Sequence, residues 1–241
     1  MRVCCYDEPE QACRAAAILI GAQLVVKPDS VLGLATGSSP VPAYQELIRL
    51  NRDGIIDFSR ATSFNLDEYV GIPEDHPCSY HRFMDEQLFG HVNMRRSAIH
   101  VPDGNAEDLT ETAAAYDRAI AAAGGIDIQL LGIGRNGHIG FNEPSDRFID
   151  GTHVISLSAS TIEANKRFFT SEAEVPRQAI TLGIGGIMRA RQILLIATGA
   201  AKAQAIRDTV YGDVTPRVQA SILRNHAHVT LLLDRAAASL L

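Results

Sequence analysis

Short apolar runs alternate with amphipathic segments along most of the 241-residue chain. The apolar runs, which predict strands, are residues 31–35, 61–66, 126–133, 153–157, 192–197 and 228–233. The segments with helical periodicity are residues 8–26, 40–51, 79–89, 106–123, 160–169 and 200–211. Strands that are apolar throughout and separated by helices are typical of a mainly parallel sheet with helices on both faces. Because there is no internal repeat and no linker composition, the pattern predicts a single α/β domain over residues 1–241.

Two local details are predicted at the amino-terminal end. A helix comes before the first strand, which begins at Val31. The next helix is predicted to start at Pro40, because proline is favoured at the first helical position, with Ser39 as its cap. The apolar part of the first helix, residues 15–26, follows acidic rather than basic residues and is too short to span a bilayer. It therefore predicts neither a signal sequence nor a membrane span.

Three loops that follow predicted strands carry polar or glycine-rich residues. They are residues 36–39 (TGSS), 65–69 (NLDEY) and 132–144 (GIGRNGHIGFNEP). Parallel strands place their carboxyl ends at one edge of the sheet, and this is where α/β proteins bind their ligands. We therefore predict that the three loops converge on one site.

The glycine-rich loop carries the most specific chemistry. His138 and Glu143 are side chains of the types that exchange protons in catalysis. The spacing of Gly132, Gly134 and Gly137 formally matches the dinucleotide-binding fingerprint, but the residues after it show no helical period and end in a proline. A nicotinamide cofactor is therefore not expected.

The other two loops each allow a functional and a plain interpretation. In an extended segment only one of the neighbours Asp67 and Glu68 can face the site, either as a general base or as part of a solvated acidic turn. Loop 36–39 is either a phosphate site at a helix start or an ordinary strand-to-helix turn, and it lacks the Gly-Lys-Ser/Thr of an ATP-binding loop. Arg167 and Lys202 are each either a ligand for an anion or a plain surface charge.

Composition narrows the range of partners. The formal net charge is −6 and no segment clusters lysine and arginine, which argues against nucleic acid or an acidic membrane as a partner. A small anionic substrate held by a few local cations is compatible with this charge. The four cysteines have neither zinc-ligand nor disulfide spacing, so we expect a reducing, cytoplasmic setting and no metal.

Several of these segments together resemble one enzyme family. Residues 65–71 (NLDEYVG) and 137–144 (GHIGFNEP) resemble motifs of the glucosamine-6-phosphate deaminases, and residues 32–37, 165–169 and 198–202 match in the same order. The resemblance implies a Rossmann-like sheet, no metal or organic cofactor, and an amino-sugar phosphate as the small-molecule partner. The implied reaction converts glucosamine 6-phosphate and water to fructose 6-phosphate and ammonia.

The resemblance also implies a role for each candidate residue. Asp67 matches the base that moves a proton from C2 to C1 of the opened sugar, and His138, oriented by Glu143, matches the acid/base that opens the ring. The residues implied to hold the phosphate are Thr36, Gly37, Ser38, Ser39, Arg167 and Lys202. Many relatives carry aspartate where this chain has Asn136. Asn136, which is also a catalytic candidate, therefore gives His138 one carboxylate neighbour fewer than in those relatives. The sequence does not fix the pH optimum of the reaction.

Three alternatives have the same architecture. A 6-phosphogluconolactonase carries a Gly-His turn but lacks the Asp-Glu-Tyr and Asn-Glu-Pro motifs, and no residue here separates a galactosamine-6-phosphate deaminase from the glucosamine enzyme. A sugar-phosphate sensor domain of a transcription regulator needs no catalytic carboxylates.

Longer hexameric relatives are activated by N-acetylglucosamine 6-phosphate through basic residues after Asn-Glu-Pro, a region that reads THVI at residues 152–155 here. We therefore expect a monomer or small homo-oligomer without that activation.

Overall fold

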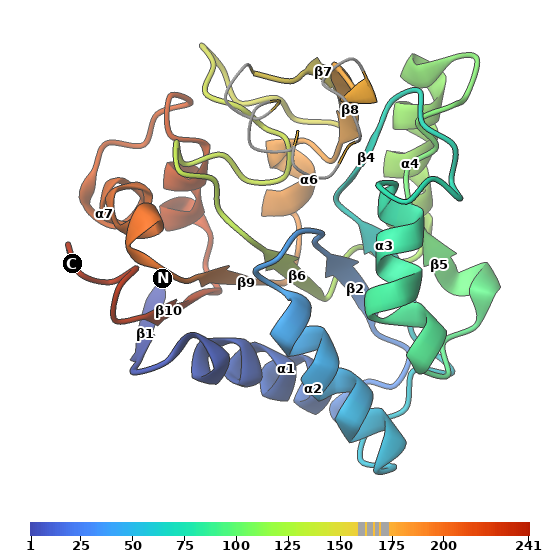
Figure 1. The fold of residues 1–241 in the computed structure, drawn as a ribbon, viewed down its shortest axis with the longest axis horizontal. Helices are drawn as coiled ribbons and strands as arrows, with labels where there is room; N and C mark the ends of the chain where they lie inside the picture. The colour runs from blue at the N-terminus through green and yellow to red at the C-terminus, as the bar shows by residue number, and fades with distance from the viewer. Residues whose placement is uncertain (159–161, 163–165, 167–168, 170–173) are drawn as a thin grey trace.

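A seven-stranded parallel sheet forms the centre of the molecule (Figure 1), in a computed structural model that describes residues 1–158, 162, 166, 169 and 174–241. Neighbouring strands of this sheet run parallel. In spatial order they are β1 (Arg2–Tyr6), β10 (Val229–Asp234), β9 (Gln192–Ala197), β6 (Ile128–Leu131), β2 (Val31–Leu34), β3 (Thr62–Asn65) and β5 (Ile99–His100). β2 and β6 are buried at every position, as their apolar sequences require in a sheet covered on both faces. The predicted parallel α/β fold is confirmed.

Helices cover both faces of this sheet. One face carries α1 (Pro9–Val26), α2 (Val41–Arg52) and α3 (Tyr80–Gln87), and α1 and α2 form the lower layer in Figure 1. The other face carries α4 (Leu109–Ala122), α6 (Ile184–Met188) and α7 (Ala203–Tyr211). The described 3₁₀ helices are η1 (Phe89–His91), η2 (Arg96–Ala98), η5 (Ala200–Lys202) and η6 (Gln219–Asn225). Each face has its own buried apolar cluster, and fully burying one large aliphatic side chain stabilises a fold by about 1.5–3 kcal/mol.

A second, antiparallel sheet stands beside the first and has the order β4-β8-β7. Its strands are β4 (Asp67–Tyr69), β8 (Gln178–Thr181) and β7 (His153–Ser156). Residues 67–69, predicted as part of a loop, instead pair with β8, with Asp67 opposite Thr181. The prediction was wrong because these three residues carry no apolar strand pattern of their own. Pairing with β8 imposes the extended conformation on them.

One prediction about the order of elements also changes. β1 precedes α1, so the first element is a strand rather than a helix. It was missed because it is an edge strand whose positions are mostly exposed, and it therefore has no continuous apolar run. The helix predicted over residues 160–169 falls largely outside the described residues.

The predicted cap of α2 is wrong as well. The helix begins at Val41 with Pro40 as its N-cap, and no side chain caps it. A cap at Ser39 would bond the N–H of Val41 or of residue 42, but Pro42 has no N–H and no bond to Val41 forms. The Ser39 carbonyl instead accepts a hydrogen bond from Cys13 Sγ, so this residue is held from the α1 side.

The strand order reverses direction at β2. From β2 the chain continues outward through β3 and β5, and it then returns to β6 on the opposite side of β2. The loops that leave β2 and β6 therefore diverge, and ligands of open α/β sheets bind where such loops separate. This topology places loops 36–39 and 132–144 on either side of the expected binding position.

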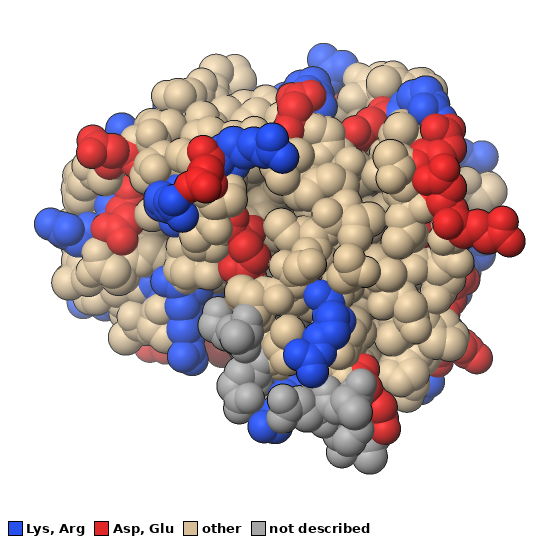
Figure 2. Space-filling model, turned by 90° about the horizontal axis from the view of Figure 1, so that it is seen from above, with Lys and Arg blue, Asp and Glu red and all other residues tan. Residues whose placement is uncertain are grey.

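The surface matches the mixed charge of the sequence. On the face shown in Figure 2, lysine and arginine side chains are interspersed with acidic ones instead of forming one basic patch. Among the described residues, no helix combines the length and apolar character needed to cross a bilayer.

Candidate active site

Asp67 lies where the loops after three neighbouring strands meet. A single residue, Leu66, separates β3 from β4, so Asp67 stands directly at the carboxyl end of β3. Thr36 Oγ1, in the loop after β2, donates a hydrogen bond to Asp67 Oδ1 over 3.3 Å. Asp67 Oδ2 lies beside Gly140 of the loop after β6, because a Cβ added there would stand 3.5 Å from it. The structure thus brings Thr36, Asp67 and the histidine-bearing loop to one point.

The Asp67 carboxyl group is held away from water. The residue is only 5% exposed. Burial raises its pKa to about 7, the charge of Glu68 acts in the same direction, and the hydrogen bond from Thr36 opposes both. A base whose pKa lies near neutrality is well matched to abstracting a proton at that pH.

Glu68 points away from Asp67, toward α3. It accepts hydrogen bonds from the backbone N–H groups of Tyr80 and His81, in the first turn of α3, over 2.9 and 3.0 Å. Its Oε2 also lies 3.0 Å from His81 Nδ1. The prediction that only one of the two neighbouring carboxylates can face the site is confirmed, and the one that does is Asp67.

The glycine-rich loop begins with a tight turn beneath His138. Gly137 N–H donates to the Gly134 carbonyl over 3.1 Å, and Gly134 N–H donates to the His138 carbonyl over 2.9 Å. The imidazole packs directly on Gly134, where an added Cβ would stand 2.3 Å from the ring. Gly137 has a φ of 82°, which favours glycine. These glycines seat the histidine ring, and residues 138–150 form no helix.

Glu143 anchors the network around His138. Asn136 Nδ2 donates a hydrogen bond to Glu143 Oε2 over 2.8 Å, and Ser158 Oγ donates to Oε1 over 3.1 Å. His138 Nδ1 lies 3.6 Å from Glu143 Oε2, which is an ion-pair distance but too long for a hydrogen bond. Asn136 therefore orients Glu143 directly. The His138 side chain is 24% exposed, so it can reach a ligand.

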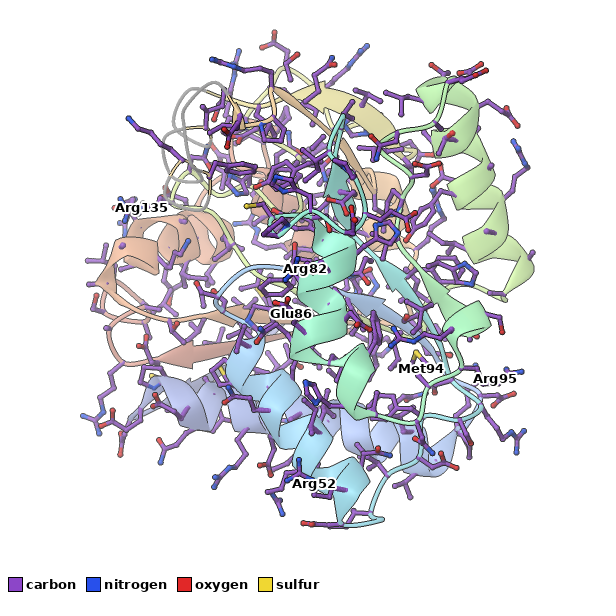
Figure 3. All side chains as sticks on the ribbon, turned by 45° about the vertical axis from the view of Figure 1, so that its right-hand side comes forward. Arg52, Arg82, Glu86, Met94, Arg95 and Arg135 are labelled. Atoms are coloured by element: carbon purple, nitrogen blue, oxygen red, sulfur yellow. The ribbon has the colours of Figure 1, made fainter. Side chains whose placement is uncertain are left out.

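Two cationic side chains stand beside the same loop. Lys202, in η5 after β9, donates a hydrogen bond from Nζ to the Ile133 carbonyl over 2.6 Å. Burial lowers the pKa of Lys202, and the nearby charge of Arg135 lowers it further. Arg135 is exposed in the turn before His138 (Figure 3), and it was missed in the sequence because a lone arginine forms no pattern. The other predicted cation, Arg167, lies outside the described residues.

Loop 36–39 presents backbone amides beside the amino-terminal end of α2. Gly37 has a φ of 105°, and both Gly37 and Ser38 are exposed. Within the described part of the chain, the backbone N–H groups of Gly37, Ser38 and Ser39 donate no hydrogen bond. Free amides beside a helix amino terminus are well suited to an anion. Because Thr36 also bonds Asp67, this loop joins the candidate anion position to the candidate base.

A distant segment supports the histidine loop from behind. Gln219 of η6 is 2% exposed, and its Nε2 donates to the Glu143 carbonyl over 3.2 Å. Ala220 N–H donates to the Gly137 carbonyl over 2.9 Å. Gln219 is 76 residues from Glu143 along the chain, so no local signal in the sequence could have indicated this contact.

Residues 9–232 match the family of glucosamine-6-phosphate isomerases/6-phosphogluconolactonase. The chain belongs to this family. It is 50% identical to a glucosamine-6-phosphate deaminase of Halothermothrix orenii over the full length of both chains. It is also 50% identical to a glucosamine-6-phosphate deaminase of Clostridioides difficile, over 99% of this chain and 96% of that one. The matched range contains Asp67, His138 and Lys202.

Two solved structures superpose on this chain. A monomeric glucosamine-6-phosphate deaminase matches with a TM-score of 0.97 and 43% identity, over all of both chains. A 6-phosphogluconolactonase of Trypanosoma brucei matches with a TM-score of 0.74 and 20% identity, over 99% of this chain and 97% of that one. The second likeness shows a shared fold alone.

Proposed function

We propose that this protein is a glucosamine-6-phosphate deaminase, which converts glucosamine 6-phosphate and water to fructose 6-phosphate and ammonia. The observation that carries the proposal is the placement of a buried carboxyl group, Asp67, against the loop that bears His138 and Glu143. The likeness to deaminases over the whole chain, at 43% to 50% identity, supports the same reaction.

The first chemical step is opening of the sugar ring by His138. The imidazole protonates the ring oxygen as its bond to C1 breaks, and the C1 hydroxyl loses its proton, which gives the open-chain aldehyde. A histidine suits this step because it can both give and take a proton near neutral pH. Glu143, held by Asn136 and Ser158, places a carboxylate oxygen 3.6 Å from His138 Nδ1.

Asp67 then carries out the isomerisation. Its carboxylate removes the proton from C2 while O1 gains one, and it returns a proton to C1, which leaves an imine at C2. Water adds to the imine carbon, ammonia leaves, and the ketone of fructose 6-phosphate remains. No step of this sequence needs a metal or an organic cofactor.

The phosphate is held at a distance from the reacting carbons. We assign it to the backbone amides of loop 36–39, which donate no hydrogen bond to any described residue, and to Lys202 and Arg167, with Arg135 adding positive charge nearby. One general base contributes only about 10²–10⁴-fold in rate, so binding of this remote group must also supply orientation.

The direct test is to incubate the protein with glucosamine 6-phosphate and to measure the ammonia and fructose 6-phosphate released. We expect equal amounts of the two products. Hydrolysis of 6-phosphogluconolactone without ammonia release would instead assign the chain to the lactonases. Galactosamine 6-phosphate, assayed in parallel, decides which epimer is preferred.

Replacing Lys202 by alanine is expected to raise KM about 10–100-fold with little change in kcat, because a charged hydrogen bond to a remote group is lost. Steady-state kinetics with glucosamine 6-phosphate measure both constants. Arg82→Ala is the matched control, since Arg82 is an exposed cation on α3 that pairs with Glu86 (Figure 3). An unchanged KM in the Lys202 variant would remove this residue from the phosphate site.

We further propose that the enzyme acts in the cytoplasm in the breakdown of N-acetylglucosamine, as a monomer or small homo-oligomer. The solved deaminase described as monomeric supports this assembly state. Residues 152–155 contain no lysine or arginine, which supports the absence of activation by N-acetylglucosamine 6-phosphate.

A further inference from the structure

Two consecutive buried carboxyl groups stand back to back on β4. Asp67 is 5% exposed and Glu68 is 2% exposed. Asp67 faces the sugar site, whereas Glu68 faces α3 and touches no residue to which the proposed reaction gives a role. Burying a second carboxylate costs free energy unless it is paired and hydrogen-bonded. A carboxylate buried directly behind the base is therefore expected to contribute to the site.

Glu68 is held by an unusually complete set of donors. Its two oxygens accept hydrogen bonds from the backbone N–H groups of Tyr69 over 2.8 Å, Tyr80 over 2.9 Å and His81 over 3.0 Å. The His81 imidazole adds a contact of 3.0 Å through Nδ1. Two of these N–H groups lie in the first turn of α3, where the helix dipole also favours a negative charge. The three-residue strand β4 is thereby fastened to the start of α3.

We propose that Glu68 is a positioning residue for Asp67, because it fixes β4 on α3 and holds a second negative charge directly behind the catalytic base. The inference rests on the proposed function of Asp67. A negative charge behind Asp67 disfavours its ionised form and so makes it a stronger base once it is ionised. Glu68 therefore acts on the Asp67 carboxyl group in two ways, by fixing the position of β4 and by adding a neighbouring negative charge.

His81 makes this charge depend on pH. Burial opposes protonation of the His81 imidazole, but the hydrogen bond and charge of Glu68, together with the charges of Glu74 and Asp103, raise its pKa. When His81 is protonated, it neutralises Glu68 and weakens the repulsion felt by Asp67. Loss of His81 and loss of Glu68 should therefore affect Asp67 in opposite directions.

The other ionisable groups around Asp67 do not share this role. Four tyrosines of the surrounding elements feel its charge, and burial raises the pKa of each of them, so all four stay neutral at pH 7. They are Tyr44 of α2, Tyr69 of β4, Tyr80 of α3 and Tyr116 of α4.

The test compares the pH profiles of kcat/KM in Glu68→Gln and His81→Gln. In Glu68→Gln the acidic limb should move to lower pH by about one unit, because a neighbouring buried charge is removed and Asp67 stays ionised further into acid. The limiting rate at high pH should fall roughly threefold, since the base is weaker. In His81→Gln the limb should move to higher pH. A loosened contact between β4 and α3 could not by itself move the acidic limbs of the two variants in opposite directions.

Controls separate the possible outcomes. Glu86→Gln removes an exposed carboxylate from α3 (Figure 3) and should keep the wild-type profile. An acidic limb that stays in place in Glu68→Gln would overturn the proposal, even if the rate falls. If Glu68→Gln does not fold, as judged by circular dichroism, an unshifted limb in His81→Gln overturns it instead. A wild-type protein that releases no ammonia contradicts the proposed function, which is a different result.

Discussion

Replacing Asp67 by asparagine is expected to lower kcat by roughly 10²–10⁴-fold, the contribution of one general base, while KM stays near the wild-type value. The amide keeps the shape of the side chain and can still meet the Thr36 hydroxyl, but it cannot accept the C2 proton. Ammonia release under steady-state conditions measures both constants. In the wild type, kcat/KM should fall below about pH 7, because burial raises the pKa of Asp67 to about 7. Wild-type turnover in the variant would remove Asp67 from the mechanism.

The same variant should be more stable than the wild type, and the gain should depend on pH. The folded pKa of Asp67, about 7, lies above the ordinary value of about 3.9 for an unfolded chain. Between these values the folded protein binds a proton that the unfolded chain has lost, so stability falls as pH rises through this window. Asparagine carries no such cost. Thermal unfolding should show a gain of roughly 4 kcal/mol at pH 8 and only about 1 kcal/mol at pH 4.5. An equal gain at both would contradict burial of the charge.

The second large effect is expected from His138→Gln. With the cyclic sugar, kcat/KM should fall by about 10²-fold or more, because the group that protonates the ring oxygen is lost. With an open-chain analogue the loss should be much smaller, since ring opening is no longer required. Glutamine keeps a polar side chain beside Glu143, so the conformation of the loop should be preserved. Equal slowing of both substrates would contradict a role in ring opening.

Asn136→Asp provides a matched comparison for the same loop. This substitution places a second carboxylate next to Glu143 in place of the amide that now donates to it over 2.8 Å. Repulsion between the two carboxylates should change the pH dependence of kcat/KM, whereas turnover should be retained because His138 itself is unchanged. The same two substrates distinguish this effect from that of His138.

Four of the strands that were predicted correctly share one physical property. β2, β6, β9 and β10 are buried on both faces, so their apolar character appears directly in the sequence. β1 and β4 did not show this signal. β1 is a partly exposed edge strand, and β4 is a three-residue strand with two acidic side chains that become buried only because other elements cover them.

The residues of the candidate site also differ in whether the sequence carries a signal for them. Asp67 and the loop with His138 and Glu143 were identified because they combine reactive side chains with positions just beyond predicted strands. Arg135 and Gln219 were missed. One is a lone exposed charge, and the other reaches Glu143 from a segment 76 residues away. Such contacts arise from packing between elements that have no pattern in common.

The amino-acid sequence by itself determined the parallel sheet, the loops at its carboxyl edge and the reactive side chains in them, because burial and backbone geometry restrict residue types locally. Only the tertiary structure decided that Asp67 faces the site while Glu68 faces α3. It also decided that the strand order reverses between β2 and β6, and that Lys202 reaches the loop of His138. These features depend on which distant segments pack together, and packing depends on the whole chain at once.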